Sequence, residues 1–322
     1  MAKLGELGKI ITGNTPKTSD AQNYESNDIC FVKPSDFTDN EITEIHQSEF
    51  YISAYAKDRA RVLPTDSILV TCIGIIGKVA INKVPCAFNQ QINAIVPEKK
   101  VCNPRYIAYA IQNLQPKMQS TANAAVVPIL NKTQFSNLEV PLLPVGEQKQ
   151  IACNLNKIDK LISLRKQQLA KLDELVKARF VEMFGDPVKN TMDWEIKPLS
   201  ELGELNRGVS KARPRNSPEL LGGPYPLIQT GEVANAKTYI TSFNSTYSEK
   251  GLAQSKMWPK GTLCITIAAN IAQTSILTFD ACFPDSVVGF ISRNMTNELF
   301  IHYWFSFFQK ILDEQAPQVA QK

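Results

Sequence analysis

The sequence contains very few of the residues that most often bind metals or act in catalysis. Only His46 and His302 are histidines among its 322 residues, and its seven cysteines are scattered and never spaced C-x-x-C. Zinc sites need closely spaced cysteine and histidine ligands, so we expect no metal site. We interpret the cysteines as reduced, mostly buried thiols, the usual state of thiols in the cytosol.

Long apolar runs are missing as well. No apolar stretch reaches the ~18 residues of a membrane-spanning helix, and no signal-peptide pattern opens the chain. The nearest approach is the aromatic segment 299–308, which is too short and is predicted to be a buried helix. We therefore expect a cytoplasmic protein that is neither secreted nor membrane-bound.

The sequence also lacks catalytic motifs. The segment Asn103-Pro104-Arg105-Tyr106 is close to the N-P-P-[YF] signature of adenine methyltransferases, but an arginine replaces the second proline and no glycine-rich cofactor loop accompanies it. An asparagine that caps a helix, followed by a proline in its first turn, explains the segment fully. With no nucleophile and no cofactor loop, we expect no catalytic residue, no bound cofactor and no enzyme activity.

One long uninterrupted stretch organises the chain. It runs from Glu147 to Phe184 without a proline or glycine. Its apolar residues recur every seven positions, at Leu155, Ile162, Leu169, Val176 and Met183. A second apolar column lies three places later and is interrupted by Arg165 and Arg179. The pattern is typical of a coiled-coil helix, which would be roughly 57 Å long. A long amphipathic helix packed on its own domain is the alternative.

The rest of the chain is an internal repeat. The spelling L-x-E-L-G at residues 4–8 recurs at residues 199–203, which is 195 positions later. The same offset aligns Phe88 with Phe283 and Tyr109 with Trp304. A chain of this length exceeds one ordinary hydrophobic core, so two domains are expected. We conclude that a domain has been duplicated.

Each copy is predicted to be a mixed α+β domain, because strand-like segments are followed by one helix-like segment. The predicted fold class is therefore α+β, with two repeated domains separated by a long coiled-coil-type helix. The predicted boundaries are 1–145 for the first domain, 146–187 for the helix and 188–322 for the second. The second repeat is expected to be truncated at its C-terminus, because it matches the first only as far as about residue 130.

Polar and basic loops are the features that could carry recognition. The net charge is only +4, which permits a nucleic-acid partner without requiring one. Four cations fall within the nine residues 207–215, and an amide-rich cluster covers residues 89–93. Arginine and lysine suit contacts to phosphates, whereas amides and hydroxyls suit base edges. The DNA-contact candidates are Thr15, Lys17, Lys33, Asn89, Gln90, Gln91, Arg207, Lys211, Arg213 and Arg215.

Three motifs together resemble those of the specificity (S) subunits of type I restriction-modification systems. The first is the pair of diverged copies that begin L-x-E-L-G. The second is P-L-L-P-x-x-E-Q-x-x-I at residues 141–151, where the long helix begins. The third is F-x-x-M-F-G-D-P at residues 180–187, where that helix ends. The resemblance extends over nearly the whole chain.

This resemblance implies a non-catalytic DNA-binding protein. Two target recognition domains would each read one half of a bipartite site in double-stranded DNA, and long helices would hold them apart. The helices would bind two modification (M) subunits, which carry S-adenosylmethionine and methylate adenine, and a restriction (R) subunit would be a further partner. In the family a C-terminal segment pairs with the central helix. This chain departs from that pattern, so we expect its apolar stripe to find another partner, including a second copy of itself.

A reading of another class remains open, in which the chain is a coiled-coil scaffold or adaptor whose repeats bind proteins. Salt-dependent binding to duplex DNA would distinguish a DNA reader from such an adaptor.

Overall fold

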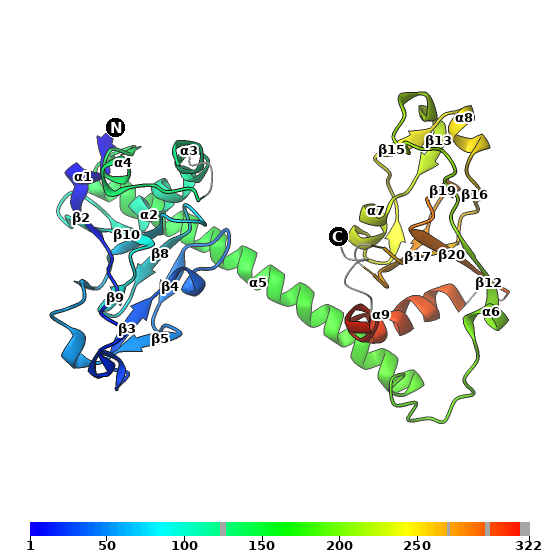
Figure 1. Cartoon of the computed structure of the whole chain (residues 1–322), viewed down its shortest axis with the longest axis horizontal. Coiled ribbons are helices and arrows are strands. Elements are labelled where there is room, and N and C mark those ends of the chain that lie inside the picture. The colour runs from blue at the N-terminus through cyan, green and yellow to red at the C-terminus, as the bar shows by residue number, and fades with distance from the viewer. Residues whose placement is uncertain (123–126, 269–270, 294–296, 316–322) are drawn as a thin grey trace. The chain divides into compact units, whose positions relative to one another are not determined.

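The computed structural model describes residues 1–122, 127–268, 271–293 and 297–315, shown as ribbons in Figure 1. The chain divides into two compact units, residues 1–167 and residues 168–322, and each is an α+β unit. One helix, α5 (Val145–Phe184), contributes residues to both units. Among the helices formed by the described residues, none has the length and hydropathy needed to cross a bilayer.

Unit 1 is built on two sheets. The larger sheet has the strand order β2 (Gly8–Thr12), β10 (Ile92–Pro97), β7 (Ile68–Thr71), β8 (Val79–Asn82) and β4 (Thr43–Ile45). The smaller sheet has the order β5 (Phe50–Ile52), β3 (Ile29–Val32), β9 (Cys86–Phe88) and β6 (Val62–Leu63). A short pair joins β1 (Ala2–Lys3) to β11 (Glu139–Val140). Within the two sheets, only the β4–β8 and β3–β9 pairs are parallel.

The central strands of the larger sheet, β10, β7 and β8, are buried on both faces, which explains why they are mostly apolar. Along β7, Leu69 belongs to the core that the larger sheet shares with β3, β6 and β9, together with Phe88 and Ile92. Its neighbours Ile68 and Val70 point the other way, because side chains alternate along a strand, and they join the core formed with helix α2.

Short helices complete unit 1. The α-helices are α1 (Leu4–Leu7), α2 (Pro104–Asn113), α3 (Gln115–Thr121) and α4 (Lys132–Ser136). The 3-10 turns are η1 (Ala21–Tyr24), η2 (Pro34–Asp36) and η3 (Ala54–Ala56). Helix α2 begins as the sequence predicted, since the Asn103 side chain accepts a hydrogen bond from the Tyr106 amide at 3.0 Å and Pro104 occupies the first turn.

Unit 2 repeats this plan with both strand orders preserved. Its larger sheet contains β12 (Gly203–Arg207), β20 (Val287–Ser292), β17 (Leu263–Thr266), β18 (Thr274–Leu277) and β14 (Tyr239–Ile240). Its smaller sheet contains β15 (Ser245–Tyr247), β13 (Leu221–Leu227), β19 (Ala281–Cys282) and β16 (Met257–Trp258). The helical segments are α6 (Leu199–Leu202), η4 (Pro218–Leu220), α7 (Thr230–Asn235), α8 (Glu249–Ala253) and α9 (Asn297–Gln315). The predicted duplication is therefore confirmed.

The repeat extends to individual hydrogen bonds. In the turn after β7 the Thr71 hydroxyl accepts from the Lys78 amide, and 195 residues later the Thr266 hydroxyl accepts from the Gln273 amide, both at 3.0 Å. The residue before each donor has a left-handed backbone, with φ of 89° at Gly77 and 61° at Ala272. The second copy keeps the turn even though alanine tolerates this conformation less well than glycine.

The first turns of α5 are fixed to unit 1 by one glutamine of the E-Q entry motif. The helix begins at Val145, two residues before the stretch 147–184 that lacks proline and glycine. The Gln148 side chain is fully buried, donates to the carbonyls of Val101 and Leu143, and accepts from the Asn103 amide. These three bonds, 2.7 to 3.0 Å long, couple the start of α5 to the start of α2.

The last turns of α5 pack against α9 within unit 2. The Phe180 ring lies 4.9 Å from the Phe184 ring and 5.3 Å from each of the Phe300 and Phe307 rings, measured between centroids. Segment 299–308 is helical, as expected, but only partly buried, because Leu299 and Phe300 are 40% and 38% exposed. The apolar stripe of α9 covers one face of the sheet, with Ile301 and Phe305 in its core.

The cysteines agree with the expectation of reduced, mostly buried thiols. All seven are free, and only Cys153 is exposed. Burial raises the pKa of the Cys72 thiol to about 11 and that of the Cys86 thiol to about 12. These thiols therefore stay protonated at neutral pH and behave as small apolar side chains of the core.

His302 makes the stability of unit 2 sensitive to acid. Its ring is 8% exposed and its Nδ1 lies 2.9 Å from the Thr274 hydroxyl. Burial holds the pKa of His302 below its usual value, although the contact with Thr274 raises it in part. The depressed pKa contributes stability that is complete above the unfolded-state pKa of about 6.5 and is lost as the pH falls toward the folded-state pKa.

We expect His302→Gln to reduce the dependence of the unfolding free energy on pH between pH 7.5 and pH 5.5. Denaturant unfolding of unit 2, measured at both pH values, provides the test. The control is His46→Gln, which changes a histidine whose side chain is 67% exposed in unit 1 and should leave that dependence as it is. An equal pH dependence in the wild type and the His302 variant would contradict the assignment.

Candidate nucleic-acid interface

In unit 1, the pairing of β2 with β10 brings the end of β2 beside the turn that precedes β10. Thr12 is paired with Asn93, the Gly13 amide donates to the Ile92 carbonyl at 3.0 Å, and the Asn14 amide donates to the Phe88 carbonyl at 3.0 Å. A side chain on Gly13 would meet the Asn89 carbonyl oxygen at 2.0 Å, so the close approach requires glycine. We call residues 12–17 together with 88–91 the unit 1 edge.

The unit 1 edge presents polar side chains at the surface. The exposed Thr15 hydroxyl donates to the exposed Gln90 side chain at 2.7 Å, which joins the two segments of the edge. Lys17 is exposed and its carbonyl accepts from the Asn23 side chain at 3.0 Å. Two predicted candidates, one hydroxyl-bearing and one amide-bearing, are thus brought together although they are far apart in the sequence.

Other candidates of unit 1 have different surroundings. Asn89 is only 7% exposed, and its side chain is used inside the turn, where it donates to the Gln91 side chain at 2.9 Å and accepts from the Gln91 amide at 3.1 Å. It shapes the turn that presents Gln90. Lys33 follows β3 on the smaller sheet, and its ammonium group lies 3.1 Å from the centre of the Phe50 ring.

Two arginines that were not among the candidates also reach the unit 1 edge. The Asn14 side chain donates to the Arg59 carbonyl at 2.8 Å and accepts from the Arg61 amide at 2.9 Å. The Arg61 guanidinium donates to the Thr12 carbonyl, and the Arg59 guanidinium stacks on the Tyr55 ring at 3.9 Å. The sequence could have suggested them only through their charge, because residues 13–61 separate β2 from β6 along the chain.

The equivalent edge exists in unit 2. The Gly208 amide donates to the Val287 carbonyl at 2.8 Å, just as Gly13 donates to Ile92 in unit 1. Asp285 occupies the position 195 residues after Gln90. Arg207, at the end of β12, donates through Nε and a terminal nitrogen to the Asp285 carbonyl at 3.0 and 2.7 Å. We call residues 207–215 together with 283–286 the unit 2 edge.

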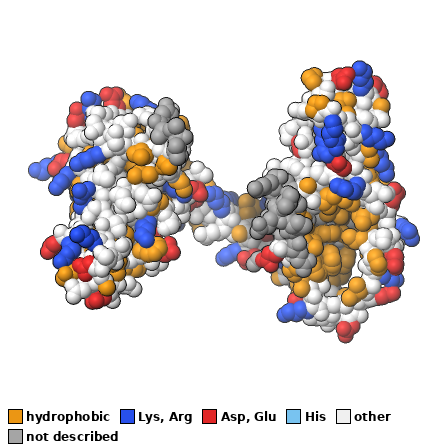
Figure 2. Space-filling view, viewed as in Figure 1, with side chains coloured by type: hydrophobic (Ala, Val, Ile, Leu, Met, Phe, Trp, Pro, Cys, Tyr) orange, Lys and Arg blue, Asp and Glu red, His pale blue; other side chains and the backbone are white. Residues whose placement is uncertain are grey.

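The predicted arginines of the unit 2 edge converge on the same aspartate. A terminal nitrogen of Arg215 donates to one carboxylate oxygen of Asp285 at 2.5 Å, and Arg213 approaches the other to 3.6 Å. Arg213 also donates to the carbonyls of Ser210 and Ala212, at 2.7 and 2.8 Å. Lys211 has an exposed side chain, while its amide donates to the Gln254 carbonyl at 3.3 Å. Figure 2 shows lysine and arginine side chains on the visible face of each unit.

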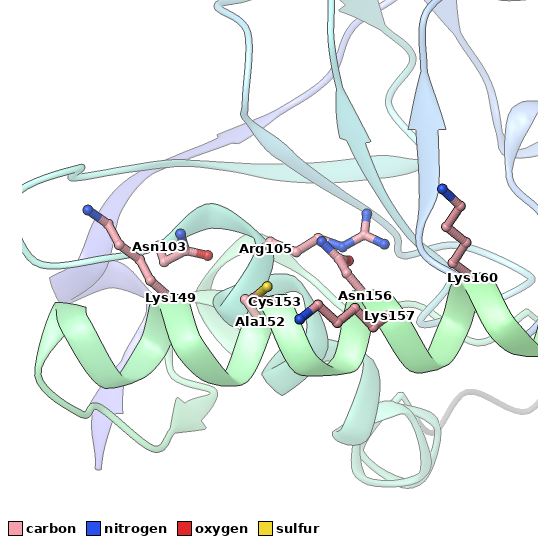
Figure 3. A pocket seen from close by; sticks show the side chains of 8 residues that line it. All are labelled: Asn103, Arg105, Lys149, Ala152, Cys153, Asn156, Lys157 and Lys160. Carbon is pink, nitrogen blue, oxygen red and sulfur yellow. The ribbon is translucent and has the colours of Figure 1, made fainter.

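A shallow basic pocket lies elsewhere in unit 1, where α2 begins beside α5 (Figure 3). It has a volume of about 370 Å³ and is lined by Asn103, Arg105, Lys149, Ala152, Cys153, Asn156, Lys157 and Lys160. One of these residues, Arg105, donates to the Glu44 carboxylate at 3.1 Å. The unit 1 edge lies at the start of β10, whereas the pocket residues Asn103 and Arg105 come after the end of that strand. The pocket is therefore a separate basic surface. In the described residues, no cluster of side chains suited to a metal ion occurs.

The predicted stripe of α5 is largely exposed. Leu155 is half-buried and lines a cavity with Tyr106 and Tyr109. The other four stripe residues have exposed fractions between 43% and 51%, and they are Ile162, Leu169, Val176 and Met183. Val176 and Met183 also border a cavity that Tyr303 of α9 helps to line. Sequence reasoning missed the aromatic contacts of α5 with α9, which the spacing of Phe180 and Phe184 by four residues could have suggested.

Comparison with known proteins decides the family. The model of the type I restriction-modification DNA specificity domain matches residues 1–174 and 191–322 of this chain. The chain belongs to this family. This is the family that the three sequence motifs resemble, and the curated relatives of the chain are named specificity subunits.

Curated relatives carry the same designation. The chain is 27% identical over 224 residues to the type I restriction enzyme MjaIX specificity subunit of Methanocaldococcus jannaschii, a match that covers 64% of this chain and 52% of that protein. It is 29% identical over 181 residues to the Escherichia coli EcoR124I/EcoR124II specificity subunit, covering 53% and 44% of the two proteins. This specificity-domain chain thus spans about half the length of the curated relatives it matches.

Solved structures share the fold. A chain from a study of complex assembly in a type I restriction-modification system superimposes with a TM-score of 0.54 at 15% identity, covering 98% of this chain and 80% of that one. The S subunit of M. genitalium does so with a TM-score of 0.50 at 12% identity, covering 98% and 78%. The specificity-subunit fold with two α+β units and a long central helix is therefore shared with these proteins.

Proposed function

We propose that this specificity-family chain binds double-stranded DNA through the unit 1 and unit 2 edges, each of which reads one half of a bipartite site. The observation that carries the proposal is the repetition of one edge geometry with different side chains. The same strand end and the same turn meet in both units, yet Thr15 and Gln90 occupy one edge where Ser210 and Asp285 occupy the other. A shared framework with divergent surface residues suits two readers of different sequences.

The chemistry of the exposed groups supports a division of labour. Hydroxyl and amide groups such as Thr15 and Gln90 can hydrogen-bond to base edges, which distinguish sequences in the major groove. Cations such as Lys17, Lys211 and the arginines of the unit 2 edge suit the phosphates, which fix position and supply salt-dependent affinity. Of the remaining candidates, Asn89 and Gln91 would act by shaping the turn, and Lys33 by adding charge at its flank.

The helix α5 is proposed to dock the M subunits, with S-adenosylmethionine bound by those subunits and not by this chain. Its support is the exposed stripe, because four aliphatic or thioether side chains at 43% to 51% exposure on one helix face would gain stability by burial in an interface. Docking of two M subunits, and of an R subunit on the resulting complex, is part of the same proposal.

We expect a change at the unit 1 edge to alter only one half of the recognised site. Thr15→Val combined with Gln90→Leu removes the hydrogen-bonding groups of the edge, and sequencing of methylated adenines in cells that carry the whole system reports the recognised sequence. One half should become relaxed or different while the other half and the spacing are retained.

The matched control is Lys99→Gln, which changes an exposed residue that pairs with Asp66 at 3.1 Å beyond the far end of β10. It should leave the methylated sequence unchanged. Changes in both halves after the edge substitution would contradict independent reading. A wild-type chain with no salt-dependent affinity for duplex DNA would favour the adaptor instead.

A further inference from the structure

Three arginines of the unit 2 edge surround one acidic residue. Arg207 binds the backbone carbonyl of Asp285, whereas Arg213 and Arg215 face its carboxylate. We call these four residues the Asp285 cluster. Among the ion pairs of the described residues, Asp285 is the acidic partner of Arg213 and of Arg215, and no second carboxylate pairs with either.

The Asp285 cluster is open to solvent and carries excess positive charge. The side chains of Arg213 and Arg215 are 57% and 42% exposed, and that of Asp285 is 36% exposed. Two guanidinium groups face the single carboxylate and a third binds the carbonyl of the same residue, and each guanidinium offers five N–H donors in a planar fork. Arg215 directs one terminal nitrogen to the carboxylate, so it keeps donors for another oxygen-bearing anion. Such an arrangement suits bidentate binding of a phosphate.

The acid is peculiar to the second copy. Its counterpart in unit 1 is the neutral Gln90, which accepts a hydrogen bond from Thr15 and pairs with no arginine among the described residues. Arg213 and Arg215 likewise align with Thr18 and Asp20 of unit 1, so the arginines and their acid occur together in one copy. This correlation suggests that the carboxylate serves the arginines and is not needed to build the turn.

We propose that the three arginines form a binding site for one DNA phosphate and that the Asp285 carboxylate is its resident counter-ion in the free protein. This inference rests on the proposed DNA-reading function of the unit 2 edge. A carboxylate and a phosphodiester each present two oxygens that share one negative charge, so one can replace the other on the same donors. The two anions repel each other, and the carboxylate therefore has to turn away into solvent when the phosphate binds. Asp285 thus weakens the binding of a DNA phosphate to the arginines, whatever the sequence of the duplex.

The test is the isosteric change Asp285→Asn in the full chain. Binding of a fluorescent mixed-sequence duplex is measured over a series of salt concentrations. The wild type should bind weakly, and the variant should bind more tightly, with a slope of log affinity against log salt that is steeper by roughly 0.9, the value for one additional phosphate contact. Combining Asp285→Asn with Arg215→Ala should bring the slope back toward that of the wild type.

The control is Glu195→Gln, which removes the same charge from an exposed pair with Lys197 in the segment before α6. It should change the slope far less than Asp285→Asn. If Asp285→Asn fails to fold, Asp285→Gln introduces the residue found in unit 1 and replaces it in the test. Thermal unfolding checks both variants.

Each outcome has a distinct meaning. An unchanged or weaker affinity in a folded Asp285 variant would overturn the counter-ion assignment, since the carboxylate would then hold the arginines in place or touch a base. If the wild type showed salt-dependent binding in that case, the proposed function would stand. If neither the wild type nor the variant bound duplex DNA, the proposed function itself would fail. If Glu195→Gln increased the affinity and the salt slope equally, the change in net charge would explain the result. The counter-ion role of Asp285 would then be wrong.

Discussion

Leu169→Asp is expected to convert the isolated chain from a self-associating species into a monomer. Leu169 is 50% exposed in the middle of the α5 stripe, and the stripe residues on either side, Ile162 and Val176, are 47% and 43% exposed. Burying an aliphatic side chain contributes about 1.5–3 kcal/mol, so a stripe of five residues at a helix interface is worth several kcal/mol. A buried aspartate without a partner costs more than the contact it replaces. Light scattering at several protein concentrations measures the change.

The matched control is Leu164→Asp. Leu164 is also 50% exposed and lies on α5, but it falls outside both apolar columns. The Leu164→Asp substitution should leave the association intact, because it places the same charge on another face of the same helix. A wild-type chain that remains monomeric at all concentrations would contradict self-association through this stripe. Loss of association with both variants would show that added negative charge anywhere on the helix prevents association and that the stripe has no specific role.

Arginines in the second column narrow the choice of partner surface. Arg179 pairs with Glu182 of its own helix at 2.7 Å, and the pair is well exposed. Exposed pairs of this kind contribute little stability, so the arginine can exchange its partner at small cost. A surface that buries the stripe would therefore need acidic side chains opposite Arg179. A second copy of α5 offers acidic side chains, among them Asp173 and Glu174.

The sequence was most informative where a pattern had one physical cause. A stretch of 38 residues without proline or glycine, 147–184, could hardly be anything but a helix, and the structure extends it by only two residues. The offset of 195 residues predicted the duplication, and the structure adds that the two copies have the same strand order, because pairing partners are inherited with the segments. Asn103 and Pro104 likewise marked the start of α2.

The candidate interface was less accessible to sequence reasoning, because it depends on which segments meet in space. The meeting of Thr15 with Gln90 follows from the β2–β10 pairing, which no local pattern encodes. The basic run at residues 207–215 was visible, but its acidic partner Asp285 lies 70 residues after Arg215 along the chain. Asn89 was chosen for its amide, yet burial commits that amide to the turn.

The contact between α5 and α9 was missed for a similar reason. The heptad spacing predicts that the apolar residues of α5 form one stripe that needs a partner. The structure divides them, because Phe180 faces α9 and is 6% exposed while Met183 remains 51% exposed three residues later. Side chains three residues apart on a helix can thus have different partners when a second helix covers only part of one face. A heptad pattern alone does not specify how far such cover extends.

Phe180→Ala is expected to loosen α9 from unit 2 and to leave unit 1 unaffected. The Phe180 ring contacts three other aromatic rings, those of Phe184, Phe300 and Phe307. Truncating a buried phenylalanine costs about 3–5 kcal/mol, because both the transfer of the ring from water and the packing around it are lost. Amide hydrogen exchange of α9 should therefore accelerate by a large factor.

The design of this experiment separates local loosening from general loss of stability. Phe243→Ala is the control, since Phe243 lies in the same unit, is 43% exposed and touches only the Phe279 ring among the described aromatic pairs. It should change exchange in α9 little.

The amides of β7 and β10 report on unit 1, whose cores contain no residue of α9 and should keep their protection. Because His302 anchors α9 to β18, amides of β18 should lose protection together with those of α9 in the Phe180 variant. Unchanged exchange in α9 would mean that the helix is held by the sheet alone and that the aromatic cluster contributes nothing measurable.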